Sequence, residues 1–68
     1  MNITLNNNKE ELDAESVTIR QLLELKKFTF KMLVIKINGN FVKREDYEIT
    51  MIYDGDIVDV IHLISGGW

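Results

Sequence analysis

Apolar and polar residues alternate over the start of the chain. Every second position there is apolar, and these are Met1, Ile3 and Leu5. This period of two is typical of a strand with one buried face. Three asparagines follow at 6–8, and asparagine tolerates the left-handed backbone of a tight hairpin turn. We therefore expect a hairpin whose charged return strand, over residues 9–14, places Leu12 and Ala14 inward.

The spacing then changes to that of a helix. Thr18 and Gln21 have the spacing of a capping box, in which each side chain bonds the backbone N–H of the other residue. The apolar positions that follow form one stripe, which we assign to the core: Ile19, Leu22 and Leu23. Lys26 and Lys27 would complement the carbonyl end of the helix dipole. The predicted helix therefore covers residues 18–27.

The second half of the chain indicates short strands joined by turns. Residues 32–37 are apolar and rich in β-branched side chains, as in a buried strand. Asn38-Gly39 is the strongest two-residue hairpin signal, because both central positions of that turn need a positive φ. The remaining elements are a return strand at 40–43, a helical turn at 44–47, a second turn at 53–56 and a last strand at 57–64.

This order of elements predicts an α+β fold. A hairpin, a crossing helix and further strands form a roll in which the first and last strands lie parallel at the sheet centre. That is the β-grasp, or ubiquitin-like, arrangement, with a mixed four- to five-stranded sheet and one main helix packed on one face. We expect this domain over residues 1–64 and a flexible tail over residues 65–68. The face opposite the helix is left to solvent or to partners.

Composition excludes several classes of function. A chain of 68 residues buries only about 60% of its surface, so a deep substrate cleft is not expected. Cysteine is absent, which excludes disulfides and thiolate chemistry and suits a reducing cytoplasm. No apolar run approaches the roughly 20 residues of a membrane span, and the start of the chain does not resemble a signal peptide. The net charge of −3 disfavours nucleic acid as a partner.

Candidate catalytic and metal-binding residues are few. His62 is the only histidine, and we interpret it as a structural strand residue. Asp54 and Asp56 flank Gly55 in a turn, but calcium takes about six to eight oxygen ligands, so turn chemistry is the better interpretation. We predict no catalytic residue, no metal and no bound cofactor, and the chain is not expected to be an enzyme.

The sequence ends in Ser65-Gly66-Gly67-Trp68. Adjacent glycines are costly to order and add no packing, so simple fraying is one interpretation. A tail without side chains can also thread into a narrow channel of another protein and deliver a carboxylate there. Four extended residues reach roughly 13 Å.

Several segments resemble the ThiS family of sulfur carrier proteins. Residues 55–67 have the closing pattern of that family: Gly-Asp, a β-branched strand and Gly-Gly. Residues 37–42 are similar to its central Asn-Gly hairpin, residues 17–23 to the start of its helix, and residues 1–7 to its first strand and turn, with Asn7 where glycine is usual. The small subunit of molybdopterin synthase, MoaD, shares the fold and the Gly-Gly ending but usually has a longer chain.

The resemblance implies a protein cosubstrate. A ThiF-like adenylating enzyme would use ATP to activate the terminal carboxylate of Gly67, and persulfide sulfur would convert it to a thiocarboxylate. The thiocarboxylate would donate sulfur to a ThiG-like thiazole synthase in thiamine biosynthesis. Gly67 would carry the sulfur, and Ser65 and Gly66 would form the access segment. The carrier itself would bind no cofactor, since ATP is used by the activating partner.

Trp68 departs from the family pattern, which ends at Gly-Gly. While Trp68 is attached, Gly67 has an amide in place of a free carboxylate, and an amide cannot be adenylated in the same way. Three interpretations remain open: a peptidase removes Trp68, Trp68 is an artificial addition, or the chain is a divergent member that does not carry sulfur through Gly67. The expectation for a carrier is that Trp68 has to be removed first.

The last strand also predicts a docking face. If Val58, Val60 and His62 point towards the helix, the next residues of the strand lie on the open face: Ile57, Asp59, Ile61 and Leu63. We predict that these four residues bind partner proteins beside the tail. Two alternatives are that loops cover the two ends of this row, or that a bulge near Asp59 inverts the alternation.

Two other functions remain open at this point. A β-grasp domain can act purely as an interaction module, with Trp68 as a binding anchor. A sulfur carrier can also serve another pathway, such as molybdopterin synthesis. Deleting Gly67 and Trp68 would separate a carrier, which loses all function, from a module that binds through its sheet.

Overall fold

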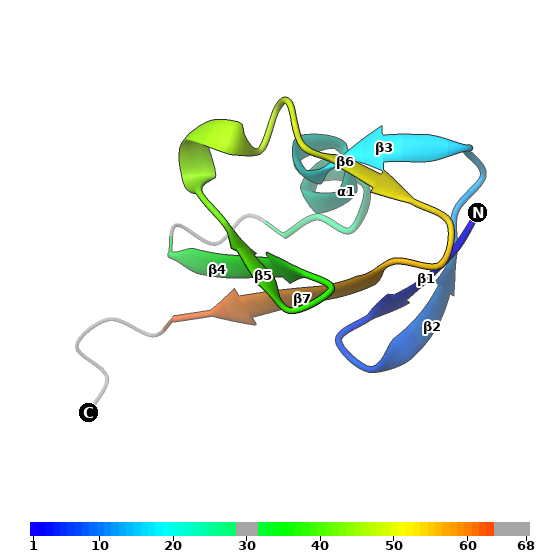
Figure 1. Ribbon diagram of the computed structural model, residues 1–68, viewed down its shortest axis with the longest axis horizontal. Coiled ribbons are helices and arrows are strands. Elements are labelled where there is room, and N and C mark those ends of the chain that lie inside the picture. Colours follow the sequence, from blue (N-terminus) through cyan, green and yellow to red (C-terminus); the bar gives the residue numbers. More distant parts are fainter. Residues whose placement is uncertain (29–31, 64–68) are drawn as a thin grey trace.

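The computed structural model describes residues 1–28 and 32–63 (Figure 1). In these two ranges no helix has both the length and the apolar character that crossing a membrane requires. The elements in chain order are β1 (Asn2–Leu5), β2 (Asn8–Glu11), β3 (Ser16–Thr18), α1 (Ile19–Leu25), β4 (Leu33–Ile37), β5 (Asn40–Val42), the 3-10 helix η1 (Arg44–Asp46), β6 (Met51–Tyr53) and β7 (Ile57–His62).

The main sheet has five strands in the order β2-β1-β7-β4-β5. β1 and β7 are parallel, and the other neighbouring strands are antiparallel. The first and last strands therefore lie side by side at the centre, and α1 lies over one face of the sheet (Figure 1). This confirms the predicted α+β fold of the β-grasp type. The sheet has five strands, the larger of the two predicted numbers.

A second, two-stranded sheet was not predicted. β3 and β6 pair antiparallel, with Val17 opposite Ile52, and they lie beside α1 (Figure 1). Both of these side chains are buried in the core. Strands of three residues are too short to show an alternating pattern, so only the pairing of two distant segments identifies them.

The helix begins as predicted. The backbone N–H of Gln21 donates to Oγ1 of Thr18 at 3.1 Å, and the N–H of Thr18 donates to Oε1 of Gln21 at 2.9 Å. Both bonds of the capping box are thus present, and Thr18 is the N-cap. The box satisfies backbone donors that have no partner in the first turn.

The helix ends earlier than the predicted residue 27. Lys26 is the C-cap, and Lys27 takes a left-handed φ of 58°. The N–H of Lys27 donates to the carbonyl of Glu24 at 3.1 Å, and the N–H of Phe28 donates to that of Leu23 at 2.8 Å. These two bonds form a Schellman motif. Glycine usually marks this position, so a lysine there hides the end of the helix from a sequence-based prediction.

Both predicted hairpin turns are confirmed. Asn6 and Asn7 have φ values of 51° and 68°, and Asn38 and Gly39 have 51° and 84°. Such paired positive values match the twist of two antiparallel strands. The return strand of the first hairpin ends at Glu11 and not at residue 14.

One apolar core joins the sheet, α1 and the small second sheet. It contains the predicted helix stripe and the inward residues of the central strands, together with Leu12, which lies just after β2. Its buried members are Ile3, Leu5, Leu12, Val17, Ile19, Leu22, Leu23, Ile35, Tyr47, Ile52, Val58 and Val60. Ala14 packs against this cluster but is only partly buried.

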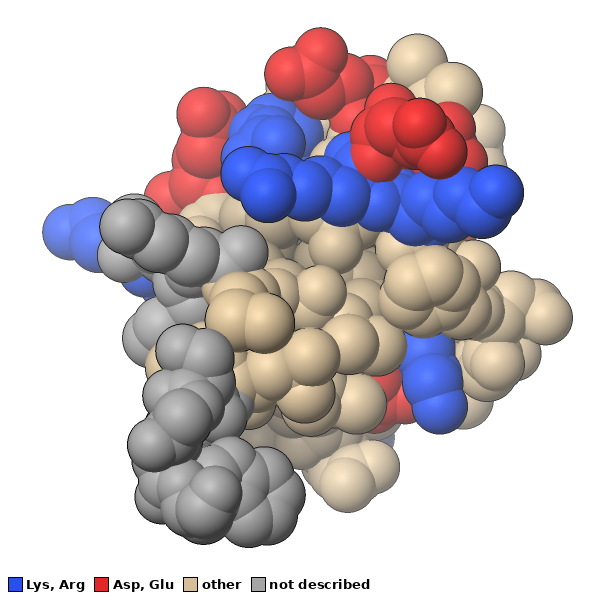
Figure 2. Space-filling model, turned by 90° about the vertical axis from the view of Figure 1, so that its left-hand side faces the viewer, with Lys and Arg blue, Asp and Glu red and all other residues tan. Residues whose placement is uncertain are grey.

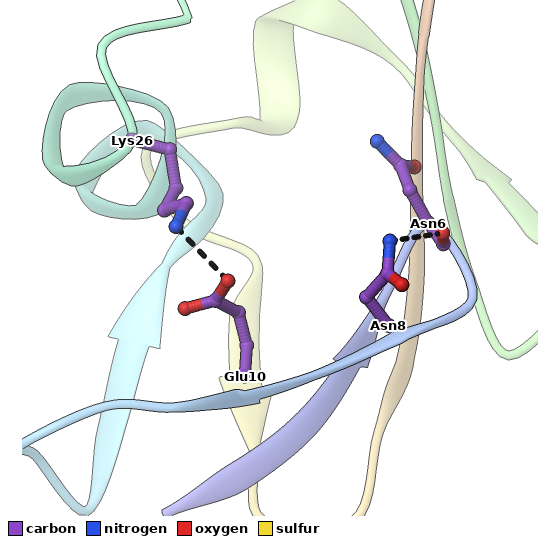
Figure 3. A network of polar contacts seen from close by, with 4 residues as sticks. All are labelled: Asn6, Asn8, Glu10 and Lys26. Atoms are coloured by element: carbon purple, nitrogen blue, oxygen red, sulfur yellow. Dashed lines mark hydrogen bonds and ion pairs between the residues drawn. The ribbon is translucent and has the colours of Figure 1, made fainter.

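Polar contacts fix the first hairpin against the helix end (Figure 3). Nζ of Lys26 lies 3.0 Å from Oε1 of Glu10, which joins the C-cap of α1 to β2. Within the hairpin, Nδ2 of Asn8 donates to the backbone carbonyl of Asn6 at 3.1 Å. A half-exposed ion pair of this kind contributes less than about 1 kcal/mol, so its role is to orient the hairpin.

Candidate docking face and tail exit

The central strand β7 alternates as predicted from Ile57 to Ile61, whereas His62, which was expected on the helix side, is exposed. Val58 and Val60 are buried, at 0% and 9% exposure, whereas Ile57, Ile61 and Leu63 are 48%, 44% and 44% exposed. The pairing of β7 with β4 runs from Val58 to His62 without a bulge. Neither a covering loop nor an inverted phase therefore applies to these three apolar residues.

Strand register identifies the neighbours of these residues on the same side of the sheet. Directly paired residues point to the same face, and Asp59 pairs with Lys36 while Ile61 pairs with Val34. Lys36 in turn pairs with Phe41 of β5. We call this surface the open face, and its members are Val34, Lys36, Phe41, Ile57, Asp59, Ile61 and Leu63.

Three members of the open face escaped the sequence-based prediction. Val34 and Lys36 belong to β4, and Phe41 belongs to β5. Residues 33–35 are all apolar, so the alternation that would show which side chains face outward is hidden. The Asn38-Gly39 turn was the available signal, because that turn sets the register between β4 and β5.

Charged groups border this end of the molecule. Figure 2 shows a broad uncharged area with a band of Lys and Arg above it and Asp and Glu beyond that band. A shallow hollow lies beside Phe41, and its lining contains both apolar and charged side chains. It is lined by Arg20, Phe41, Lys43, Arg44, Glu45 and Glu48. In the upper part of this view, basic side chains therefore lie between the uncharged area and the acidic groups.

The start of β7 is held by a side-chain network around Asp56. Oδ1 of Asn38 accepts from the N–H of Ile57 at 2.9 Å, and Nδ2 of Asn38 donates to Oδ1 of Asp56 at 3.1 Å. Oδ2 of Asp56 accepts from the N–H of Tyr53 at 2.9 Å. These bonds close the turn before β7 and hold the strand in its register.

The two turn carboxylates therefore have structural roles. Asp54 accepts from the N–H of Asn2 through Oδ1 at 2.6 Å, and both oxygens of Asp56 accept hydrogen bonds. Residues 1–28 and 32–63 contain no cluster of three or more His, Cys, Asp or Glu that could hold a metal ion. His62 is exposed on β7.

One titratable group in the described part of the chain has a clearly shifted pKa. Burial raises the pKa of the Tyr47 phenol, and the charges of Arg44 and Arg20 partly oppose this. The guanidinium of Arg20 lies 6.0 Å from the centre of the Tyr47 ring. Tyr47 is a member of the core, so the shift reflects packing and not a reaction centre.

The described part of the chain ends at Leu63, one residue after β7. The N–H of Leu63, the last residue described, donates to the carbonyl of Met32 at 2.9 Å. The predicted access segment and sulfur-carrying residue, Ser65, Gly66 and Gly67, lie outside the described residues, as does Trp68. Gly67 lies four positions after Leu63, a span of at most roughly 14 Å.

A family model for the ThiS family matches residues 2–67 of the chain. The chain belongs to the ThiS family. Members of this family are small sulfur carriers of thiamine biosynthesis and not enzymes, and they act with adenylating and thiazole synthase enzymes. The match ends at Gly67 and leaves out Trp68.

Solved structures of ThiS proteins share this fold. A crystal structure of a thiamine biosynthesis protein (ThiS) from Geobacter metallireducens is 32% identical, covers 98% of this chain and all of that chain, and superposes with a TM-score of 0.89. A solution structure of a thiamine biosynthesis protein from the same organism is 31% identical and covers 100% of this chain and 90% of that one, with a TM-score of 0.80. A search of curated proteins found no match. The predicted family, β-grasp fold and non-enzymatic character are confirmed.

Proposed function

We propose that this protein carries sulfur for thiazole formation as a thiocarboxylate on Gly67. The family match carries this proposal, because it runs through Gly66-Gly67, which follow the end of β7 at His62 by four and five positions. Glycine suits this position since a terminus without side chains passes through a channel in which any Cβ would collide. The residues of the tail do not need to act as acids or bases.

The chemistry takes place in partner enzymes. A ThiF-like adenylating enzyme joins the Gly67 carboxylate to the α-phosphate of ATP and releases pyrophosphate, because a carboxylate is a poor electrophile until its oxygen belongs to a good leaving group. The terminal sulfur of a persulfide then attacks the acyl carbon and releases AMP. A thiol breaks the S–S bond of the resulting acyl disulfide, which yields the thiocarboxylate and a new disulfide. The thiocarboxylate is the soft nucleophile that a ThiG-like thiazole synthase uses.

This proposal requires removal of Trp68. Hydrolysis of the Gly67–Trp68 amide by a peptidase produces the free carboxylate that adenylation needs. The indole is also too bulky for a channel that fits glycine. Gly67 is thus the sulfur-carrying terminus, and Ser65 and Gly66 are the segment that reaches into the partner.

The open face is the proposed partner-binding surface. Its residues on β7 are the exposed Ile57 and Ile61 and the partly exposed Asp59, and the exposed Leu63 directly follows the strand. Exposed apolar side chains next to each other on one face are typical of protein interfaces. A partner that accepts Gly67 lies within roughly 14 Å of Leu63, so it has to approach this end of the open face.

Adenylation and mass measurements test the proposal. Forms ending at Gly67, at Trp68 and at Gly66 are incubated with ATP and a ThiF-like enzyme from the same host, and pyrophosphate release is measured. We expect pyrophosphate release only with the form that ends at Gly67. Mass spectrometry of protein isolated from its host should show a terminus at Gly67, and in part the mass change of one oxygen replaced by sulfur. Equal inactivity of all three forms, or a native protein that uniformly retains Trp68, would contradict the proposal.

A further inference from the structure

Two opposite charges lie in the middle of the open face. Lys36 of β4 is paired in register with Asp59 of β7, and both side chains are partly exposed. Apolar residues lie on both sides of this charged row: the exposed Ile57 on one side, and the exposed Ile61 with the partly exposed Val34 on the other. The charges therefore interrupt a surface that is otherwise apolar.

These charges are not used by the fold. Among residues 1–28 and 32–63, neither side chain makes a hydrogen bond or an ion pair. The carboxylates of Asp54, Asp56 and Glu10, in contrast, all accept hydrogen bonds or form an ion pair within the described structure. Lys36 and Asp59 are thus available to another molecule.

We infer that Lys36 and Asp59 determine which protein docks on the open face and in which orientation, a conclusion that rests on the proposed carrier function. The occupant is the adenylating enzyme, with a carboxylate placed over Lys36 and a cation placed over Asp59. A surface that covers the neighbouring apolar residues also removes water from both charges. Because Lys36 and Asp59 are neighbours of opposite sign, a partner that sets a charge of the same sign against either of them is rejected.

Lys36 and Asp59 also determine the orientation in which the carrier docks on its partner. Its two charges lie side by side across neighbouring strands. Turning the partner by half a turn about the sheet normal would bring each charge opposite one of its own sign. Only one of the two orientations is therefore favourable. Electrostatic complementarity of this kind provides specificity more than raw affinity.

A charge-swapped variant tests this inference. The double variant Lys36→Asp with Asp59→Lys keeps the net charge and an opposite-charge pair across the strands, so we expect it to fold with unchanged stability, checked by urea unfolding. Its matched control is Glu24→Lys with Lys27→Glu, which swaps two exposed charges at the helix. All proteins are made as the full chain and as the form ending at Gly67.

Binding to the ThiF-like enzyme of the same host is measured by calorimetry, and the adenylation rate is measured against carrier concentration. For the form ending at Gly67 we expect the swap to raise the dissociation constant and the half-saturating concentration at least about tenfold, with the maximal rate retained and the control unchanged. A swap that binds within about twofold of the original chain would overturn this inference and leave the carrier function intact. If the form ending at Gly67 with Lys36 and Asp59 unchanged neither binds nor reacts, both the inference and the proposed function are overturned.

Discussion

Oδ1 of Asn6 accepts a hydrogen bond from the backbone N–H of Val60 at 2.8 Å. β1 ends at Leu5, so its backbone does not reach this point of β7. The N–H of Asn6 also donates to the carbonyl of Val58 at 2.9 Å. One turn residue therefore continues the parallel pairing beyond the last residue of its strand and holds the part of β7 that leads to the tail.

Replacing Asn6 is expected to weaken the fold. Asn6→Ala leaves the part-buried N–H of Val60 without its acceptor, which costs about 1–3 kcal/mol, and adds the cost of a left-handed alanine, about 1–2 kcal/mol. Asn6→Gly loses the acceptor but adopts the positive φ freely, so it should be less destabilised than Asn6→Ala. Urea unfolding measures both changes. Equal stability of the original chain and both variants would show that this bond does not contribute.

Truncating the centre of the core is expected to be severe. Leu22 is fully buried between α1 and the sheet, and Leu→Ala at such sites costs about 2–5 kcal/mol through lost burial and a cavity. A domain of this size has a total stability of roughly 3–10 kcal/mol. Leu22→Ala should therefore be largely unfolded at moderate urea concentration. Leu25→Ala, an exposed position on the same helix, is the control, and a comparable loss there would contradict the assignment of the buried face.

The stability of the protein is expected to fall at alkaline pH in part through Tyr47. Burial raises the pKa of its phenol above the usual 10.0, so the unfolded chain loses this proton first. The contribution is fully present below pH 10 and is lost as the pH rises through the higher pKa of the folded state. Tyr47→Phe should flatten this part of the profile of unfolding free energy against pH. Tyr53→Phe, which removes the phenol of an exposed tyrosine, is the control variant.

A charge in the apolar part of the open face is expected to impair docking. Ile61 is exposed on this face, so Ile61→Asp should leave the unfolding free energy within about 0.5 kcal/mol of the original. Covering an unpaired carboxylate is unfavourable, so binding to the adenylating enzyme should weaken. Calorimetry with Ile49→Asp, an exposed apolar residue outside the open face, provides the comparison. Unchanged binding of Ile61→Asp would remove the open face from the proposed function.

Local patterns were sufficient for most elements of the fold. The capping box at Thr18, the Asn-Gly turn at Asn38 and the alternation along β7 depend on neighbours a few residues away, and each was confirmed. The end of the helix was misplaced because Lys27 occupies a left-handed position that glycine usually marks. A conformation that an unusual residue adopts leaves no local signal.

Residue order alone was enough to predict the β-grasp roll and the exposed side of the last strand, since these follow from spacing within short segments, and its motifs resemble the ThiS family. Only the tertiary structure determines which side chains share a surface. The pairing of Val17 with Ile52, of Lys36 with Asp59, and of Asn6 with Val60 joins segments far apart in the chain. Strand register creates these contacts, and register is set by how the whole core packs together.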